Sequence, residues 1–146
     1  MKKIIIAAAL TTIATISSAS EVGISAVRDY ASHKDGMRVS ASLGQIAGFT
    51  PQLSYTSIDK AYDRYAIGGQ YTLTSVGPVA LAVTGAGVYQ NPVKGVNGYG
   101  ITGGLKATVS LTKNVELVAN AERFAGQNRI SASNGTVTSL GANIKF

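Results

Sequence analysis

The C-terminal stretch of the chain, residues 136–146, reads TVTSLGANIKF. Apolar side chains stand at every second position in its last half, namely Leu140, Ala142, Ile144 and Phe146. Small or polar residues stand between them. Because successive side chains of a strand point to opposite faces, this alternation predicts a β-strand with one apolar and one polar face.

The same alternation recurs along the chain before this stretch and is interrupted by turn-forming residues. Strands are expected at residues 21–29, 37–46, 51–58, 64–74, 79–89, 98–111, 115–124 and 136–146. Most are close to the roughly 9–11 residues that a tilted strand needs to cross a bilayer. We therefore predict an all-β fold, an eight-stranded antiparallel up-and-down transmembrane β-barrel.

The connections between the expected strands fall into two groups. The tight ones are residues 47–50, 75–78 and 112–114. The longer or more polar ones are residues 30–36, 59–63, 90–97 and 125–135. Short turns of a membrane barrel face the periplasm and longer loops face outward. An even number of strands places both chain ends on the side of the short turns.

Alternation alone does not separate a membrane barrel from a soluble one, because a soluble barrel has the same pattern with its faces exchanged. Two further features favour the membrane. The apolar faces are rich in Ala, Gly and Val, and the chain has no Trp, whereas a soluble core of this size needs bulkier side chains. Aromatic residues also form two bands, which are typical of bilayer interfaces. The band near the longer connections is Tyr30, Tyr65, Tyr89 and Tyr99, and the opposite band is Phe49 and Phe146.

The N-terminal segment has the layout of a secretory signal. Lys2 and Lys3 precede an uncharged apolar stretch at residues 4–16, and Ser17, Ser18 and Ala19 supply small residues for cleavage after Ala19. The apolar stretch is too short to be a spanning helix. We therefore expect residues 1–19 to be a cleaved signal peptide and residues 20–146 to form the barrel.

The terminal strand supplies a resemblance to a known class. Its alternate apolar residues and final Phe146 resemble the C-terminal signal of bacterial outer-membrane proteins, which the barrel-assembly machinery reads. With the export signal and eight expected strands, the chain resembles the small outer-membrane barrels of the OmpX/Ail, opacity-protein and OmpA transmembrane-domain types. The resemblance implies a location in the bacterial outer membrane and contact with that machinery during biogenesis. The expected loops are shorter than those of the adhesive members.

Polar residues of the strands are expected to point into the barrel. This lumen set is Arg38, Arg64, Gln70, Lys106, Glu116, Asn120 and Glu122. Eight strands enclose only enough space for side chains, and buried charges are costly unless they are paired. We therefore expect Glu116 and Glu122 to pair with some of Arg38, Arg64 and Lys106, so that a polar network fills the lumen.

Composition argues against several other classes of function. The chain has no cysteine and one histidine, which does not favour a disulfide framework or a transition-metal site. That residue, His33, lies in a polar, turn-like stretch, and a catalytic base is normally held by rigid elements. The basic residues are scattered although the net charge is +6, so a nucleic-acid partner is not expected. We expect no enzyme activity, cofactor or metal.

The expected function is a structural or cell-surface interaction role in the outer membrane. Basic residues near the outer rim are candidate contacts for lipopolysaccharide phosphates, namely Arg28, Arg123 and Arg129. Outer-membrane lipid is the other expected partner. Two alternatives stay open, a narrow channel for ions or small solutes and a soluble periplasmic barrel that binds a ligand.

Overall fold

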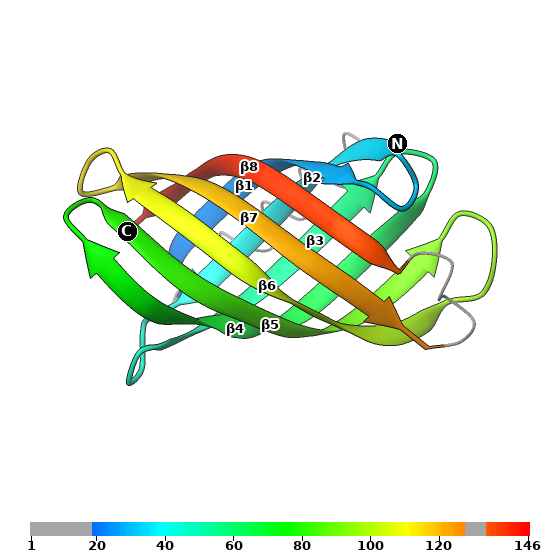
Figure 1. The fold of residues 1–146 in the computed structure, drawn as a ribbon, viewed down its shortest axis with the longest axis horizontal. Helices are drawn as coiled ribbons and strands as arrows, with labels where there is room; N and C mark the ends of the chain where they lie inside the picture. Colours follow the sequence, from blue (N-terminus) through cyan, green and yellow to red (C-terminus); the bar gives the residue numbers. More distant parts are fainter. Residues whose placement is uncertain (1–18, 128–133) are drawn as a thin grey trace.

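The computed structural model describes residues 19–127 and 134–146, where eight antiparallel strands close into one barrel (Figure 1). The strands are β1 (Ala19–Asp29), β2 (Lys34–Leu43), β3 (Phe49–Ile58), β4 (Tyr62–Val76), β5 (Val79–Pro92), β6 (Gly98–Ser110), β7 (Val115–Gly126) and β8 (Gly135–Lys145). Each strand pairs with its neighbours in the sequence, and β1 pairs with β8. The predicted fold class is therefore confirmed. The described residues include no helix long and apolar enough to span a bilayer.

The terminal strand closes the barrel. Ile144 lies opposite Val22 and Leu140 opposite Ala26 in the β1–β8 ladder. The ladder extends to the last residue, because the Phe146 backbone N–H donates to the carbonyl of Ser20 at 3.0 Å. Closure leaves neither β1 nor β8 with an unpaired edge, which is what a sheet in lipid requires.

The strands are longer than expected at the end that carries the β1–β2 loop. The connections at this loop end are residues 30–33, 59–61, 93–97 and 127–134, and those at the opposite, turn end are 44–48, 77–78 and 111–114. The expected contrast between long loops and short turns is therefore weak. Polar residues such as Asp63 and Asn91 resemble loop residues in the sequence, but they face each other in the β4–β5 ladder.

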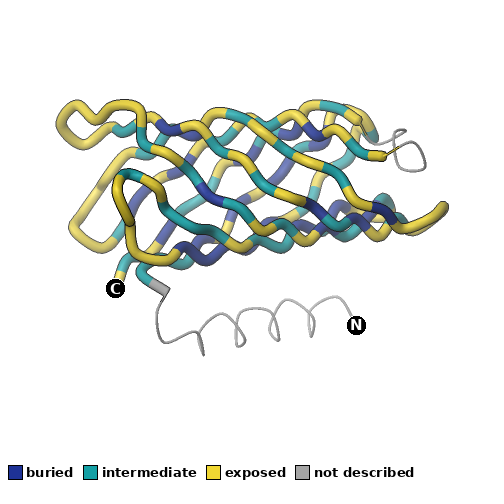
Figure 2. The backbone as a smooth tube through the Cα atoms, turned by 90° about the horizontal axis from the view of Figure 1, so that it is seen from below, coloured by how far each residue is buried: buried dark blue, intermediate teal, exposed yellow. Residues whose placement is uncertain are grey.

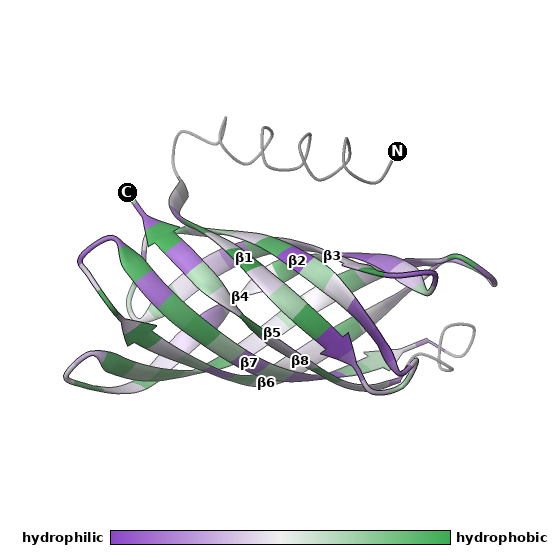
Figure 3. Cartoon of the chain, turned by 90° about the horizontal axis from the view of Figure 1, so that it is seen from above, coloured by the Kyte–Doolittle hydropathy of each residue, from purple (hydrophilic) through white to green (hydrophobic). Residues whose placement is uncertain are grey.

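The apolar faces of the strands point outward. Ile67 and Ile101 expose 68% of their surface and Leu140 exposes 67%, whereas the inward-facing Ser42 and Thr56 expose 1% each. Figure 3 shows hydrophobic and hydrophilic residues alternating along the strands, and Figure 2 shows the matching alternation of burial. A wall with exposed large apolar side chains and buried polar ones suits a lipid surround.

Glycine makes one close contact between strands possible. A Cβ at the inward-facing Gly141 of β8 would collide with the backbone carbonyl of Ile24 and the side chain of Ser25 in β1. A Cβ at the outward-facing Gly85 would meet nothing closer than 3.9 Å. Gly141 therefore lies where two strands pack closely, whereas Gly85 lies on an open part of the wall.

Gly141→Ala should lower the free energy of unfolding by about 1–3 kcal/mol, because the methyl group forces β1 and β8 apart. The matched Gly85→Ala should change it by less than about 0.5 kcal/mol. Urea unfolding of both variants in lipid vesicles, followed by tyrosine fluorescence, measures the difference. Equal effects of the two substitutions would contradict the register between β1 and β8.

Candidate functional site

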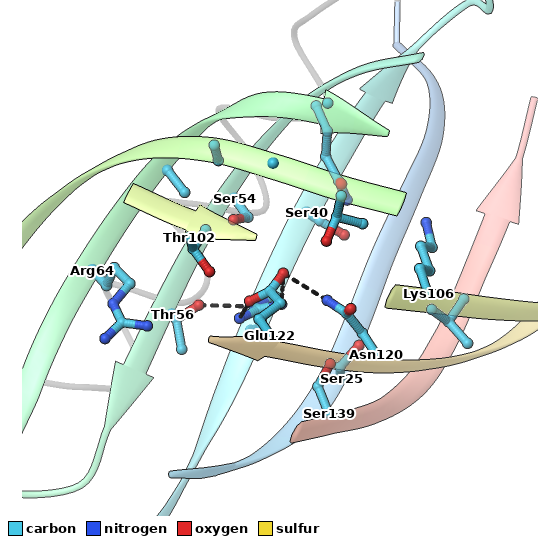
Figure 4. A pocket seen from close by; sticks show the side chains of 18 of the residues that line it. Ser25, Ser40, Ser54, Thr56, Arg64, Thr102, Lys106, Asn120, Glu122 and Ser139 are labelled. Atoms are coloured by element: carbon cyan, nitrogen blue, oxygen red, sulfur yellow. Dashed lines mark hydrogen bonds and ion pairs between the residues drawn. The ribbon is translucent and has the colours of Figure 1, made fainter. Parts of the chain in front are cut away.

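A buried ion pair spans the middle of the lumen. Arg38 of β2 donates from Nη2 to Oε2 of Glu122 in β7 at 2.7 Å, and from Nη1 to Oε1 at 3.1 Å. Arg38 Nε also donates to Thr56 Oγ1 at 3.0 Å, and Asn120 Nδ2 donates to Glu122 Oε1 at 2.6 Å. Figure 4 shows Glu122 with Asn120 and Thr56 beside it. The bidentate geometry and the two extra hydrogen bonds offset the cost of burying both charges.

A second polar layer lies toward the turn end. Lys145 Nζ lies 2.5 Å from Glu116 Oε1, which also accepts a hydrogen bond from Ser110 Oγ at 2.9 Å. Beside this pair, Lys106 Nζ lies 3.8 Å from Glu21 Oε1, and Asn143 donates to the same Glu21 oxygen. Each carboxylate of this layer therefore has a cation and a neutral donor.

Arg64 has a different environment, at the loop end of the lumen. Its guanidinium carbon lies 4.6 Å from the ring centre of Tyr62 and 4.1 Å from that of Phe124. Nε and Nη2 both donate to Gln90 Oε1, at 3.0 and 2.7 Å. Two aromatic faces and an amide oxygen thus hold this cation.

An apolar lid lies around Arg64. It consists of two clusters of inward-facing residues that each expose 3% or less, one of Val27, Ile58, Tyr62 and Val137, the other of Val88 and Phe124. The Arg64 stack joins the clusters, because Tyr62 belongs to the first and Phe124 to the second. The loop end of the lumen therefore combines apolar packing with the buried polar residues Arg64, Gln90 and Asp29, whereas polar and charged side chains dominate toward the turn end.

A small cavity remains between the lid and the turn-end layer. Its volume is about 40 Å³, and it is lined mainly by hydroxyl, amide and charged side chains (Figure 4). Several buried polar atoms there have no protein partner, among them Arg64 Nη1, Thr84 Oγ1 and Asn120 Oδ1. A water needs roughly 10–15 Å³ of this kind of volume, so the cavity has room for about three or four waters.

The lumen residues predicted from the sequence all lie on inward faces. One predicted partner is wrong, since Glu116 contacts Lys145 instead of Arg38, Arg64 or Lys106. The alternation could have identified further members of the network, which are Glu21, Gln90, Asn143 and Lys145. The apolar lid was also missed, although inward positions such as Val27 break the polar face of their strand.

The expected tyrosine band is a row on the outer wall. Tyr65, Tyr89 and Tyr99 stand level on β4, β5 and β6, and Tyr55 of β3 extends the row. Neighbouring ring centres are 5.1, 6.5 and 5.3 Å apart. Tyr55 was missed because only the strand register brings it level with Tyr65. Outside this row, Tyr30 is exposed in the β1–β2 loop.

The remaining predicted residues lie at the rim and the ends of the barrel. Phe49 begins β3 and Phe146 follows β8, so both lie at the turn end. Arg28 and Arg123 face outward near the loop end, and Arg28 Nη1 pairs with Asp35 Oδ1 at 2.9 Å. Arg129 and the expected signal peptide, apart from Ala19, lie outside the described residues.

Nothing in the described structure resembles a catalytic or metal centre. His33 is exposed in the β1–β2 loop. Among residues 19–127 and 134–146, no group of three or more His, Cys, Asp or Glu side chains could hold a metal ion. The polar side chains of the lumen are instead engaged mainly with one another.

Known proteins share this architecture. The N-terminal β-barrel domain of Pseudomonas aeruginosa OprF superposes with a TM-score of 0.70 at 17% identity, over 88% of this chain and 98% of that domain. Neisserial surface protein A gives 0.60 at 17% identity, over 86% and 94%. The Yersinia pestis outer membrane protein Ail gives 0.56 at 11% identity, over 87% and 99%. The chain has the fold of the small eight-stranded outer-membrane barrels.

At the level of fold, this outer-membrane barrel architecture confirms the resemblance inferred from the terminal strand. Neither a protein-family model nor a curated protein sequence matches the chain. The barrel is therefore recognised by its architecture.

Glu122→Gln should lower the free energy of unfolding by about 3–5 kcal/mol, because it leaves the Arg38 guanidinium buried without its counter-charge. The double variant Arg38→Met with Glu122→Met should recover most of this loss, since an apolar pair of similar volume has no charge to desolvate. Urea unfolding in vesicles measures both. A Glu122→Gln variant as stable as the parent would show that the pair contributes nothing.

Proposed function

We propose that this chain is a non-enzymatic β-barrel of the bacterial outer membrane, with a closed lumen and a structural or cell-surface interaction role. The observation that carries the proposal is the inversion of the wall, with large apolar side chains exposed and ion pairs buried inside. In water, such a surface would drive association, because soluble monomers rarely expose apolar area of this extent.

The export and assembly steps belong to the same proposal. Residues 1–19 direct export, and the barrel-assembly machinery recognises the terminal strand through Leu140, Ala142, Ile144 and Phe146. The structure supports this role indirectly, because the first three side chains face outward and Phe146 exposes 81% of its surface. The folded barrel then contacts outer-membrane lipid and lipopolysaccharide.

Two barriers in series support a closed lumen. The ion pair between Arg38 and Glu122 spans the middle, and the apolar lid fills the loop end. A hydrated ion would have to separate the charges and also cross apolar packing, which costs free energy at both steps. A narrow channel is the second candidate, because the cavity beside the ion pair is polar. The exposed apolar wall argues against a soluble ligand-binding barrel.

The parent protein should show no steady conductance in planar bilayers. Ile58→Ser, Phe124→Ser, Arg38→Ser and Glu122→Ser combined should produce steady conductance, because this variant removes one large apolar side chain from each cluster of the lid and also removes the ion pair. Ile67→Ser with Ile101→Ser is the matched control, since it makes the same kind of change on the outer wall and should stay silent. Single-channel recording compares the three proteins.

Heat-dependent gel mobility verifies beforehand that each variant has formed a barrel. Steady conductance of the parent would overturn the closed lumen in favour of the channel. Silence of the folded fourfold variant would show that the lid and the ion pair are not the barriers.

A further inference from the structure

We infer that the outer wall from β6 through β7, β8 and β1 to the start of β2 carries a docking site for one phosphate-bearing membrane lipid. The phosphate lies between Arg28 and Arg123 near the loop end, and an acyl chain lies in the groove that begins at Arg28 and continues toward the turn end. The inference rests on the proposed membrane location, and it names a specific partner and a specific side of the barrel.

Two cations lie on either side of β8 on the outer wall. Arg28 lies opposite Thr138 in the β1–β8 ladder, and Arg123 lies opposite Thr136 in the β7–β8 ladder. All four side chains face outward. Since neighbouring strands are about 4.8 Å apart, the arginines flank β8 at a separation that two long side chains can close around one phosphate. The threonine hydroxyls between them are further donors.

Arg123 has no ion-pair partner among the described residues. No carboxylate within the described part of the chain lies within salt-bridge distance of its exposed guanidinium. A lipid-facing arginine costs about 2–4 kcal/mol at the bilayer midplane and less near the interface. A lipid phosphate at that level supplies the missing charge in the bidentate geometry that guanidinium prefers.

A groove on the outer wall begins at Arg28 and leads away from the two arginines. Its volume is about 600 Å³, within the roughly 300–1,000 Å³ of pockets that hold small ligands. The lining includes Arg28 and Thr138 at one end and small side chains along its length, namely Ala26, Ala107, Ala119 and Ala121. On β7, the outward positions following Arg123 toward the turn end are Ala121 and Ala119. A charged end and an alanine floor match a headgroup and an acyl chain.

The opposite side of the barrel offers a comparison. A groove of about 680 Å³ lies there beside the row of Tyr55, Tyr65, Tyr89 and Tyr99, and its lining contains no charged residue. This groove can accept any apolar chain. Of these two grooves, the one beneath Arg28 combines an apolar floor with a cation, which selects an anionic lipid for that side.

Asp35 opposes binding at this site. Its carboxylate pairs with Arg28 at 2.9 Å and lines the same groove. Both partners are well exposed, so the pair contributes little to stability, and a lipid phosphate can compete for Arg28. Removing the Asp35 charge should therefore strengthen lipid binding, whereas removing either arginine should weaken it.

The test uses the purified chain in phosphatidylcholine vesicles with or without diphosphoryl lipid A. The rate of thermal unfolding is read from heat-dependent gel mobility. Lipid A should slow unfolding of the parent about tenfold, which corresponds to about 1.4 kcal/mol. Arg28→Gln with Arg123→Gln should abolish most of this slowing, and Asp35→Asn should increase it.

The matched control is Lys60→Gln with Lys94→Gln, which removes two charges from other loops at the same end of the barrel and should retain the slowing. If the control lost as much of the slowing by lipid A as the arginine variant does, the effect would be one of general charge, and the proposed site would be overturned. Slowing by inorganic phosphate alone would overturn the lipid as the occupant. Arginine variants that fold in phosphatidylcholine yet respond fully to lipid A would refute the inference while leaving the membrane barrel intact. Failure of the parent to enter vesicles would instead contradict the proposed function.

Discussion

The pairing of β1 with β8 is the interaction on which the rest of the structure depends. A sheet in hydrocarbon cannot leave backbone N–H and C=O groups unpaired, because no water is present to bind them. The ladder from Glu21 opposite Lys145 to Asp29 opposite Val137 satisfies that requirement. Once the sheet is closed, every strand has one face toward the surroundings and one toward a narrow interior, and the alternation of the sequence assigns side chains to each.

The closed wall then imposes charge balance on the interior. Four cations (Arg38, Arg64, Lys106 and Lys145) and four carboxylates (Glu21, Asp29, Glu116 and Glu122) of the described residues point into the lumen, and Lys34 lies opposite Asp29 at its loop-end rim. The formal charges of the first eight cancel, and hydrogen bonds from amides and hydroxyls supply many of their remaining contacts. The apolar lid adds a second kind of barrier at the loop end, where the aromatic rings around Arg64 replace a carboxylate partner. The interior therefore works as packing that stabilises the barrel.

Much of this fold could be predicted because a period of two is readable from residue types alone. The faces of Arg38, Glu122 and Lys106 follow directly from it. Contacts across the lumen could not be predicted in the same way, since they depend on strand register and barrel shear. For this reason the partner of Glu116 was wrong and the row from Tyr55 to Tyr99 was incomplete. Polar residues at strand ends, such as Asp63, were predicted to lie in loops. Residue type alone does not show that such a residue has a hydrogen-bonded partner on the next strand.

The central claim is that the wall faces lipid and the charges face inward. Cell fractionation followed by electrophoresis of unheated and heated samples tests it most directly. The account predicts that the chain sediments with the outer membrane, requires detergent for extraction, and migrates differently before and after heating because the closed barrel resists unfolding. Recovery in the soluble fraction without a heat-dependent shift would contradict it.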